Sequence, residues 1–306
     1  VTYFDQPNCY KISNDTVEVI VTTDIGPRII RYAFKDGENI FAEIPLTSEQ
    51  VRQNIWHPYG GHRLWHAPEA IPRSYEPDNS PIKFKIEGNN TIRLTQAIEP
   101  NTRIQKEMVI TLDEKGSGVT VRHFLTNRGL WPVNMAPWAM SIMNGGGTTI
   151  FPQEPYRSHD DYLLPARPMV MWHYTNLSDP RWKIGPKFIR LSTDAAMKEP
   201  QKVAIANKQN WAAYAREGNL FIDRFAYREG AIYADYGSNT ETYTTGTFME
   251  IESLGPLEVI EPEKTVEHIE RWYLYKDVQI GNTEETLETA LKPLLAQSPM
   301  QLQSTP

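Results

Sequence analysis

The sequence predicts an all-β protein, an antiparallel sandwich of many short strands with one short helix near the C-terminus. More than ten runs of β-branched and aromatic residues, separated by turn residues, support the strands. A single capped amphipathic segment supports the helix. The 306 residues fit two ordinary domains or one large all-β domain. Because the chain contains no convincing linker, we expect one domain over residues 1–280, a helix over 281–297 packed on it, and a frayed tail over 298–306.

The first half of the chain supplies strands joined by recognisable turns. Residues 35–39 (Lys-Asp-Gly-Glu-Asn) and 113–116 (Asp-Glu-Lys-Gly) have the composition of tight turns. Alternation is clearest over residues 82–87, which end at a Gly-Asn-Asn turn. The predicted strands of this half cover residues 17–22, 28–34, 82–87, 91–96, 103–112 and 118–126.

The second half combines further strands with the only strong helix. Its predicted strands cover residues 186–191, 203–206, 211–216, 219–227, 247–254 and 265–275. Asn282 or Thr283 can cap the helix, whose apolar stripe contains Leu287 and Leu291 and which Pro293 interrupts. Residues 152–183 are rich in Pro, Asp, Tyr and Trp without periodicity, and so long a loop in a compact domain is often functional.

Charge and hydrophobicity exclude two classes of partner. The formal net charge is −7 and no run of Lys or Arg is present, whereas binding the phosphate backbone of nucleic acid needs a basic face. No apolar run approaches the roughly 20 residues needed to span a bilayer. We therefore expect neither a nucleic acid nor a membrane as partner.

Cysteine usage and the first residue bear on the compartment. Cys9 is the only cysteine, so neither an intrachain disulfide nor a thiolate zinc cluster can form. This fits a reducing cytoplasm, although many secreted bacterial proteins also lack disulfides. The chain begins with Val1 rather than Met, which fits removal of a preceding segment. The expectation is a cytoplasmic or periplasmic protein, with the choice left open.

The most unusual stretch of the sequence is residues 56–69, WHPYGGHRLWHAPE. Aromatic faces cover the C–H patches of a sugar ring, while Arg, His and Glu side chains bond its hydroxyls. The Gly pair permits a sharp turn or a close approach to a ligand. The segment therefore predicts a binding site for a small polyhydroxylated ring. The alternative is a surface loop whose two Trp side chains dip into the core.

Three blocks of sequence resemble the galactose mutarotase-like superfamily, which includes aldose 1-epimerases and hexose-6-phosphate mutarotases. The first runs from Ile25-Gly26-Pro27-Arg28-Ile29 to Gly37-Glu38-Asn39-Ile40-Phe41, and the second is Tyr59-Gly60-Gly61-His62-Arg63-Leu64-Trp65. The third joins Phe248-Met249-Glu250-Ile251-Glu252-Ser253 to a strand that reaches Trp272. The chain is more similar to a bacterial branch of this superfamily whose function is not assigned. The resemblance implies a β-supersandwich in which one sheet holds a sugar.

The resemblance also implies acid–base chemistry, with a Glu as base and a His as acid. Glu250 stands at the position of the family's Glu, and Glu252 shares its face of the strand because side chains alternate with a period of two. Trp138 stands where the family's His is expected, and an indole can stack on a pyranose but cannot protonate it. The acid would therefore come from His62, with His57 and His66 as neighbours.

Other polar residues complete the expected site. Arg63 has a forked donor for a hydroxyl, carboxylate or phosphate, and Trp65 offers a second stacking face. Asp235, in the polar run of residues 233–244, could bond hydroxyls or bind Ca²⁺, but its spacing is not that of an EF-hand loop. His123, alone on a strand, is more typical of a structural residue than of a catalyst. We expect no cofactor and no metal.

Three functions follow from these observations. The leading expectation is an aldose-1-epimerase-like isomerase that interconverts the anomers of a free sugar or sugar acid. Its alternative is a non-catalytic sugar-binding module that lost the acid at Trp138. A polysaccharide lyase or hydrolase would need a further catalytic domain for which this chain has no room. The expected partner is a small carbohydrate, and the sequence makes no prediction of oligomeric state.

Overall fold

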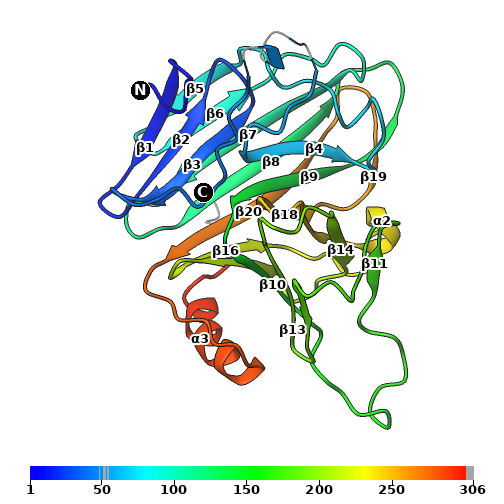
Figure 1. Ribbon diagram of the computed structural model, residues 1–306. Helices are drawn as coiled ribbons and strands as arrows, with labels where there is room; N and C mark the ends of the chain where they lie inside the picture. The colour runs from blue at the N-terminus through cyan, green and yellow to red at the C-terminus, as the bar shows by residue number, and fades with distance from the viewer. Residues whose placement is uncertain (48, 51–52, 54, 301–306) are drawn as a thin grey trace.

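The computed structural model describes residues 1–47, 49–50, 53 and 55–300, which form two antiparallel ten-stranded sheets packed face to face (Figure 1). The first sheet runs in the order β1 (Cys9–Ser13), β2 (Val17–Thr22), β3 (Arg28–Phe34), β4 (Gly61–Ala67), β9 (Val133–Asn144), β18 (Phe248–Leu254), β17 (Thr240–Thr244), β14 (Gln201–Ile205) and β11 (Met169–Met171), with β19 (Glu258–Ile260) paired to β9. The second runs in the order β12 (Trp182–Ile184), β13 (Phe188–Ser192), β10 (Thr148–Pro152), β15 (Trp211–Arg216), β16 (Asn219–Phe225), β20 (Thr265–Tyr275), β8 (Val119–Asn127), β7 (Ile104–Leu112), β6 (Thr91–Thr95) and β5 (Lys83–Glu87). The predicted all-β class is confirmed.

The main core lies between the two sheets and follows from strand alternation. In β8 every second residue is buried and the others are partly exposed, as the period of two requires. The centre of this core is an aromatic cluster whose four rings come from β3, the segment before β4, β16 and β20. All six pairs of ring centroids in it lie 5.5–6.4 Å apart, the distance range of favourable aromatic pairs; the members are Tyr32, Phe41, Phe221 and Trp272.

The C-terminal helix α3 (Glu284–Ala296) lies on the outer face of the second sheet (Figure 1). Thr283 caps it in a reciprocal pair with Thr286, and Leu287 and Leu291 are buried against β15 and β16. The predicted C-terminal helix is therefore confirmed, but it continues through Pro293, which was expected to interrupt it. Ser298, the first residue of the expected frayed tail, is fully buried, and residues 301–306 lie outside the described chain.

The stretch at residues 56–69 is not a surface loop. Residues 61–67 form β4, in which every side chain is buried, because β4 lies between β3 and β9 and has packing partners on both faces. Gly61 has a positive φ of 71°, and a Cβ there would meet the backbone of Ile29 at 2.3 Å. The glycine therefore allows β4 to enter the sheet close to β3.

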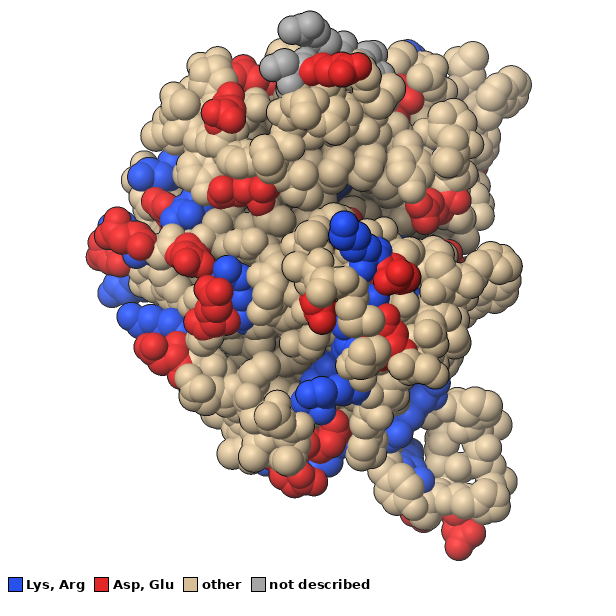
Figure 2. Space-filling view, in the orientation of Figure 1, with Lys and Arg blue, Asp and Glu red and all other residues tan. Residues whose placement is uncertain are grey.

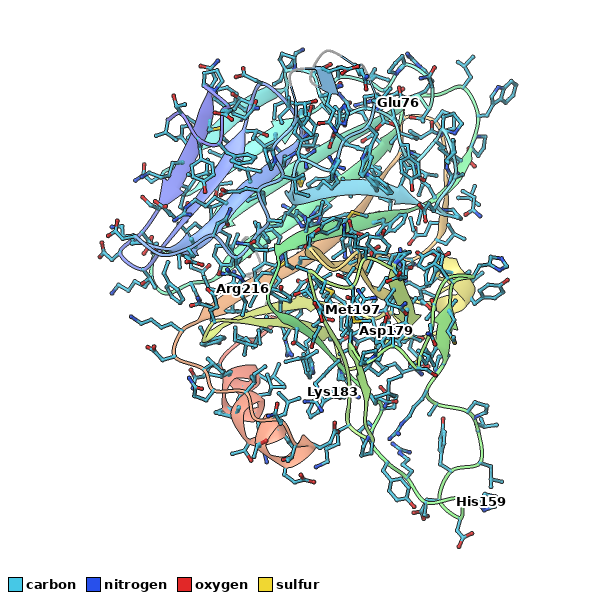
Figure 3. The ribbon with its side chains drawn as sticks, in the orientation of Figure 1. Glu76, His159, Asp179, Lys183, Met197 and Arg216 are labelled. Atoms are coloured by element: carbon cyan, nitrogen blue, oxygen red, sulfur yellow. The ribbon has the colours of Figure 1, made fainter. Side chains whose placement is uncertain are left out.

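The expected long loop at residues 152–183 contains two short strands, β11 and β12. Its middle part projects from the body of the molecule, with His159 near the tip (Figures 1 and 3). Its second half returns to the first sheet, where β11 pairs with β14. The segment thus brings Trp172 and Tyr174 to an edge of that sheet.

No helix among the described residues is long and apolar enough to cross a membrane. Figure 2 shows acidic and basic side chains interspersed over the face in view.

We predict that Phe221→Ala lowers the free energy of unfolding by about 3–5 kcal/mol, because it removes a fully buried ring from the aromatic cluster. The control Phe84→Ala removes the same ring from edge strand β5, where the side chain is 49% exposed, and should cost below about 1 kcal/mol. Chemical denaturation followed by circular dichroism measures both. Equal losses in the two variants would contradict the assigned core.

Candidate functional site

A cavity of about 430 Å³ opens on the outer face of the first sheet, within the size range of small-molecule sites. Adjacent strands β4, β9, β18, β17 and β14 form its floor, and the segments before and after β4 and after β11 form its sides. Eight aromatic side chains and three charged ones dominate its lining; the full set is Trp56, Pro58, Trp65, Glu69, Tyr75, Trp138, Met140, Trp172, Tyr174, Lys202, Tyr243, Phe248 and Glu250.

Strand register decides which residues reach this floor. Glu250 pairs with Ile142 and Tyr243, and the next residue on the same face, Glu252, pairs with Met140 and Glu241. Two residues further along, Leu254 pairs with Trp138, which pairs with Trp65 on β4. Side chains in these rows share one face, since directly paired residues project to the same side of a sheet.

The aromatic residues form two groups around Glu250. In the first group, Trp65 contacts three neighbouring rings edge-on, with centroids 4.9–5.5 Å away; these rings are Trp56, Tyr75 and Trp138. In the second, Tyr243 lies 6.4 Å from Tyr174 and 6.3 Å from Phe248. The cavity therefore offers flat apolar faces on two sides of a carboxyl group.

Glu250 is the titratable group best placed for chemistry. It is 9% exposed, so burial raises its pKa to about 8, with repulsion from Glu252 adding to the effect and Lys202 and Arg63 opposing it. A carboxyl with this pKa is mostly protonated at pH 7 and can donate a proton as well as accept one. Such a pKa in a cavity is typical of acid–base sites.

Lys202 carries the positive charge of the cavity floor. Its ammonium lies 2.7 Å from Glu241 Oε2 and 3.3 Å from Glu252 Oε2, and 4.9 Å from the centre of the Trp138 ring. Burial lowers the pKa of Lys202, but attraction by the two carboxylates outweighs this and leaves the pKa well above its usual value. Trp138 donates from Nε1 to the same Glu252 oxygen at 2.7 Å, so Glu252 orients both groups.

Arg63 lies on the cavity side of β4 but behind Trp56, with its guanidinium 4.9 Å from the centre of that ring. Its Nη2 donates to the His57 carbonyl at 2.8 Å and to Asp78 at 3.1 Å, and the same Asp78 binds Arg28 at 2.7 Å. Since Arg63 is fully buried, it supports the wall of the cavity rather than facing a ligand.

The expectation that His62 and Glu250 line one cleft is wrong. His62 pairs with Ser141, which pairs with Ile251, so its side chain projects from the opposite face of the sheet to Glu250. There it is fully buried between the sheets, with Nε2 2.7 Å from His123 Nε2. A group so placed cannot reach a ligand in the cavity.

His66 and His57 also lie away from the cavity. His66 shares the inner face of β4 with His62, 3.6 Å from Glu99. His57 is buried in the segment before β4, with Nε2 2.8 Å from the Gln50 carbonyl oxygen. Neither is part of the cavity lining, so the cluster of three histidines predicted from residues 56–69 does not exist as a site.

The remaining expected residues lie in the cavity lining, directly beneath it or in a neighbouring hollow. Trp65 and Trp138 line the cavity, and Glu252 lies directly beneath it. Asp235 has a left-handed backbone conformation in the short helix α2 (Ala234–Gly237) and lies in an adjacent hollow that shares Trp172 with the cavity.

The lining also contains residues that the sequence did not predict, among them Met140, Tyr75, Trp172, Tyr174, Lys202 and Tyr243. Tyr75 and Trp172 come from irregular segments without periodicity, although residues 152–183 stood out as a long loop. Lys202 is the second residue of the short strand β14, whose partner, β17, looks like a polar turn in sequence. Only the pairing of distant strands brings these residues together.

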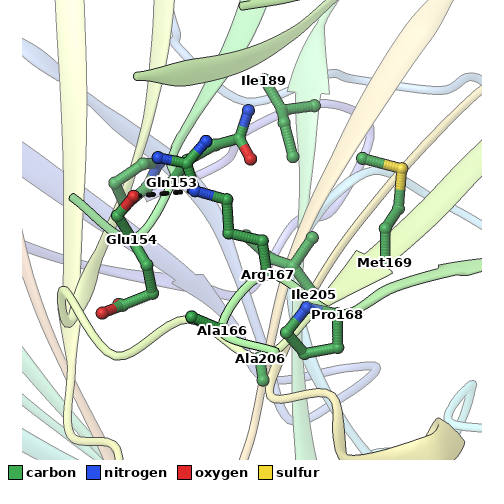
Figure 4. A pocket seen from close by; sticks show the side chains of 10 residues that line it. Gln153, Glu154, Ala166, Arg167, Pro168, Met169, Ile189, Ile205 and Ala206 are labelled. Atoms are coloured by element: carbon green, nitrogen blue, oxygen red, sulfur yellow. Dashed lines mark hydrogen bonds between the residues drawn. The ribbon is translucent and has the colours of Figure 1, made fainter. Parts of the chain in front are cut away.

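Two other hollows do not combine a buried carboxyl group with aromatic walls. The one at the base of the projecting segment, near Arg167 and Met169, measures about 20 Å³, room for no more than a water molecule (Figure 4). Arg167 Nε donates there to the Glu154 carbonyl at 2.9 Å. The other, about 470 Å³, lies between α3 and the second sheet and is lined mainly by apolar side chains such as Phe188, Trp211 and Leu291.

Comparison with known proteins was made on families, on curated proteins and on solved structures. No protein-family model matches the chain, and neither does any curated protein. Solved structures do match it. A galactose mutarotase-like protein from Lactobacillus casei aligns with 88% of this chain and 100% of its own, at 10% identity and a TM-score of 0.55. A putative aldose 1-epimerase from Escherichia coli K12 aligns with 88% of this chain and 99% of its own, at 10% identity and a TM-score of 0.53.

A third match extends the comparison to a larger protein. This TPR-domain containing protein from Parabacteroides distasonis is 13% identical, with a TM-score of 0.58, and the match covers 89% of this chain but 48% of that one. At such identities the likeness concerns the fold. The protein has the galactose mutarotase-like fold, as the resemblance of its sequence led us to expect.

Proposed function

We propose that the protein binds a small carbohydrate in the aromatic cavity and interconverts its anomers, as an aldose-1-epimerase-like isomerase. The observation that carries the proposal is Glu250, an acid–base group with a pKa near 8 at the floor of an aromatic cavity. The fold shared with galactose mutarotase-like proteins is consistent with it.

The composition of the lining supports a sugar as ligand. Aromatic faces such as Trp65 and Tyr243 cover C–H patches of a pyranose ring, and the few polar groups between them bond its hydroxyls. Lys202 has three N–H donors, and Glu241 and Glu252 accept only some of them. Its remaining donor capacity suits a sugar hydroxyl or the carboxylate of a sugar acid.

Mutarotation needs a proton removed from the anomeric hydroxyl and a proton delivered to the ring oxygen. No histidine lines the described cavity, so the proposed chemistry uses the neutral carboxyl of Glu250 for both transfers. Its O–H protonates the ring oxygen while its carbonyl oxygen accepts the anomeric proton. The bond between the anomeric carbon and the ring oxygen breaks as the carbonyl of the open-chain sugar forms. Rotation about the adjacent C–C bond and the reverse transfers give the other anomer, and Glu250 returns to its initial form.

A non-catalytic sugar-binding module is the second candidate. The observation that favours it is Trp138, which occupies the cavity floor where the resemblance places the family's histidine. Both candidates require sugar binding in the same cavity. They differ in whether Glu250 transfers protons.

We predict that Glu250→Gln retains sugar binding and lowers anomer exchange by about 10²–10⁴-fold, because the amide keeps the shape but cannot exchange protons in this way. NMR exchange spectroscopy on freshly dissolved monosaccharides and uronates measures both quantities in one sample. The control is Glu258→Gln on β19, where Glu258 forms an ion pair with Arg228 away from the cavity. Equal exchange rates with the wild type and Glu250→Gln, for a sugar that binds, would favour the non-catalytic module.

The pH dependence tests the protonation state that the mechanism uses. Because the active form is the neutral carboxyl, kcat/KM should be constant below pH 8 and fall about tenfold per pH unit above it. A carboxylate base would give the opposite profile, rising toward pH 8 and then levelling. Stopped-flow polarimetry between pH 6 and 10, corrected for the uncatalysed rate, distinguishes the two profiles.

We predict that Tyr174→Ala weakens sugar binding about tenfold with little change in the unfolding free energy, because this half-exposed ring forms one wall of the cavity. Tyr236→Ala serves as control, since Tyr236 is 93% exposed and lies outside the cavity. Titration calorimetry gives the affinities. Equal affinities for both variants would move the binding site elsewhere.

A further inference from the structure

A second polar cluster lies between the sheets, separated from the cavity by the first sheet. It consists of His62 on β4, His123 on β8 and Glu270 on β20, with Asp223 on β16 beside Glu270. All four side chains are at most 1% exposed. One ligand atom from each of the first three, two imidazole nitrogens and one carboxylate oxygen, lies within 4.8 Å of the others.

The two imidazoles aim their Nε2 atoms at each other, 2.7 Å apart. His123 Nδ1 lies 3.2 Å from the His268 carbonyl oxygen, so Nδ1 carries the proton and Nε2 presents a lone pair. His62 Nδ1 lies 2.8 Å from Ser141 Oγ, which fixes that ring from behind. Histidines that bind a metal are oriented in this way, by a partner on the nitrogen that does not bind it.

The carboxylates complete the arrangement. Glu270 Oε2 lies 3.7 Å from His62 Nε2, while Ser253 donates to its Oε1 and Trp272 to its Oε2. Oδ1 of the adjacent Asp223 is buried without a hydrogen-bond partner. The four side chains come from both sheets, so a bound ion would join the sheets through the middle of the core.

This cluster differs from other buried carboxyl groups in having no positively charged partner among the described residues. Buried Glu99 pairs with Lys106 and buried Asp179 with Arg181, but no described Lys or Arg forms an ion pair with Asp223 or Glu270. Two carboxylates without a cation would be neutralised by a divalent ion.

We propose that His62, His123, Glu270 and Asp223 form a structural zinc site that cross-links the two sheets. Imidazole and carboxylate ligands suit Zn²⁺, and four protein ligands without an open position are typical of structural zinc. Ligand atoms at about 2.0–2.1 Å from Zn²⁺ in a tetrahedron lie about 3.4 Å apart. The 2.7 Å separation of the two Nε2 atoms and the 3.7 Å separation of His62 Nε2 from Glu270 Oε2 bracket that value, so small shifts suffice for these three side chains. Asp223 lies outside the set of ligand atoms within 4.8 Å of one another, so its carboxyl must move further to become the fourth ligand.

Because the cluster has no access to solvent, the ion must enter during folding. The untagged chain is therefore unfolded in guanidinium with EDTA and refolded with Zn²⁺, with Co²⁺ or with EDTA, then desalted. We expect one Zn²⁺ per chain by elemental analysis and a Tm at least about 5 °C above that of the EDTA sample. Co²⁺ should give the visible absorption of a four-coordinate site.

The proposal would be overturned by less than about 0.2 metal ions per chain together with equal Tm values in Zn²⁺ and EDTA. In that case the carboxyl groups of the cluster would be protonated, and the two imidazoles would be joined by a hydrogen bond.

Single substitutions locate the ion. His123→Gln and Glu270→Gln should each lower the bound metal at least tenfold and abolish the Tm difference between Zn²⁺ and EDTA. His66→Gln is the matched control, a buried histidine of the same strand whose carboxylate neighbour, Glu99, already has Lys106 as partner. It should keep the metal. Metal retained by both cluster variants, or lost equally by the control, would place the site elsewhere. If a variant fails to refold, the wild-type measurement decides alone.

Discussion

The period-two alternation of β4, β9 and β18 is the constraint on which the rest of the structure depends. These three neighbouring strands are buried on both faces, one toward the second sheet and one toward the cavity. Register therefore assigns every side chain to one of two separate environments. Glu250 and Trp65 reach the cavity, while His62, next to Arg63 in sequence, belongs to the core between the sheets. A shift of one residue in any of these strands would exchange the two sets.

Much of the fold could be predicted because its strands alternate locally and its helix carries its own cap. The shared face of Glu250 and Glu252 could also be predicted, since it depends on two positions of one strand. The placement of His62 could not, because residues 56–69 look like a loop, with a Gly pair and two prolines. Alternation separates His62 from Arg63 only once these residues are known to form β4. The positions of Lys202 and Trp172 in the cavity depend on the pairing of strands that are far apart in sequence, and no local sequence pattern indicates such pairing.

The buried charges explain why register is so strongly specified. Lys202 with Glu241 and Glu252, and Arg28 with Asp78 and Arg63, each join groups from different strands or segments. Such clusters add little net stability, because desolvation of the charges offsets their attraction. They penalise alternatives instead: a shifted register would leave charges without partners in a low-dielectric interior. The floor of the cavity is thus held in part by groups that do not line it, such as Glu241, Glu252 and Asp78.

The origin of the cavity's side walls has an evolutionary consequence. Trp172 and Tyr174 come from the long segment between β10 and β13, which joins the first sheet at its edge, where β11 pairs with β14. Insertions, deletions and substitutions in such a segment leave the two sheets and their core intact. The side walls of the cavity can therefore diverge quickly between descendants of this chain, while the place of the Glu250 carboxyl at the floor is fixed by the register of the central strands.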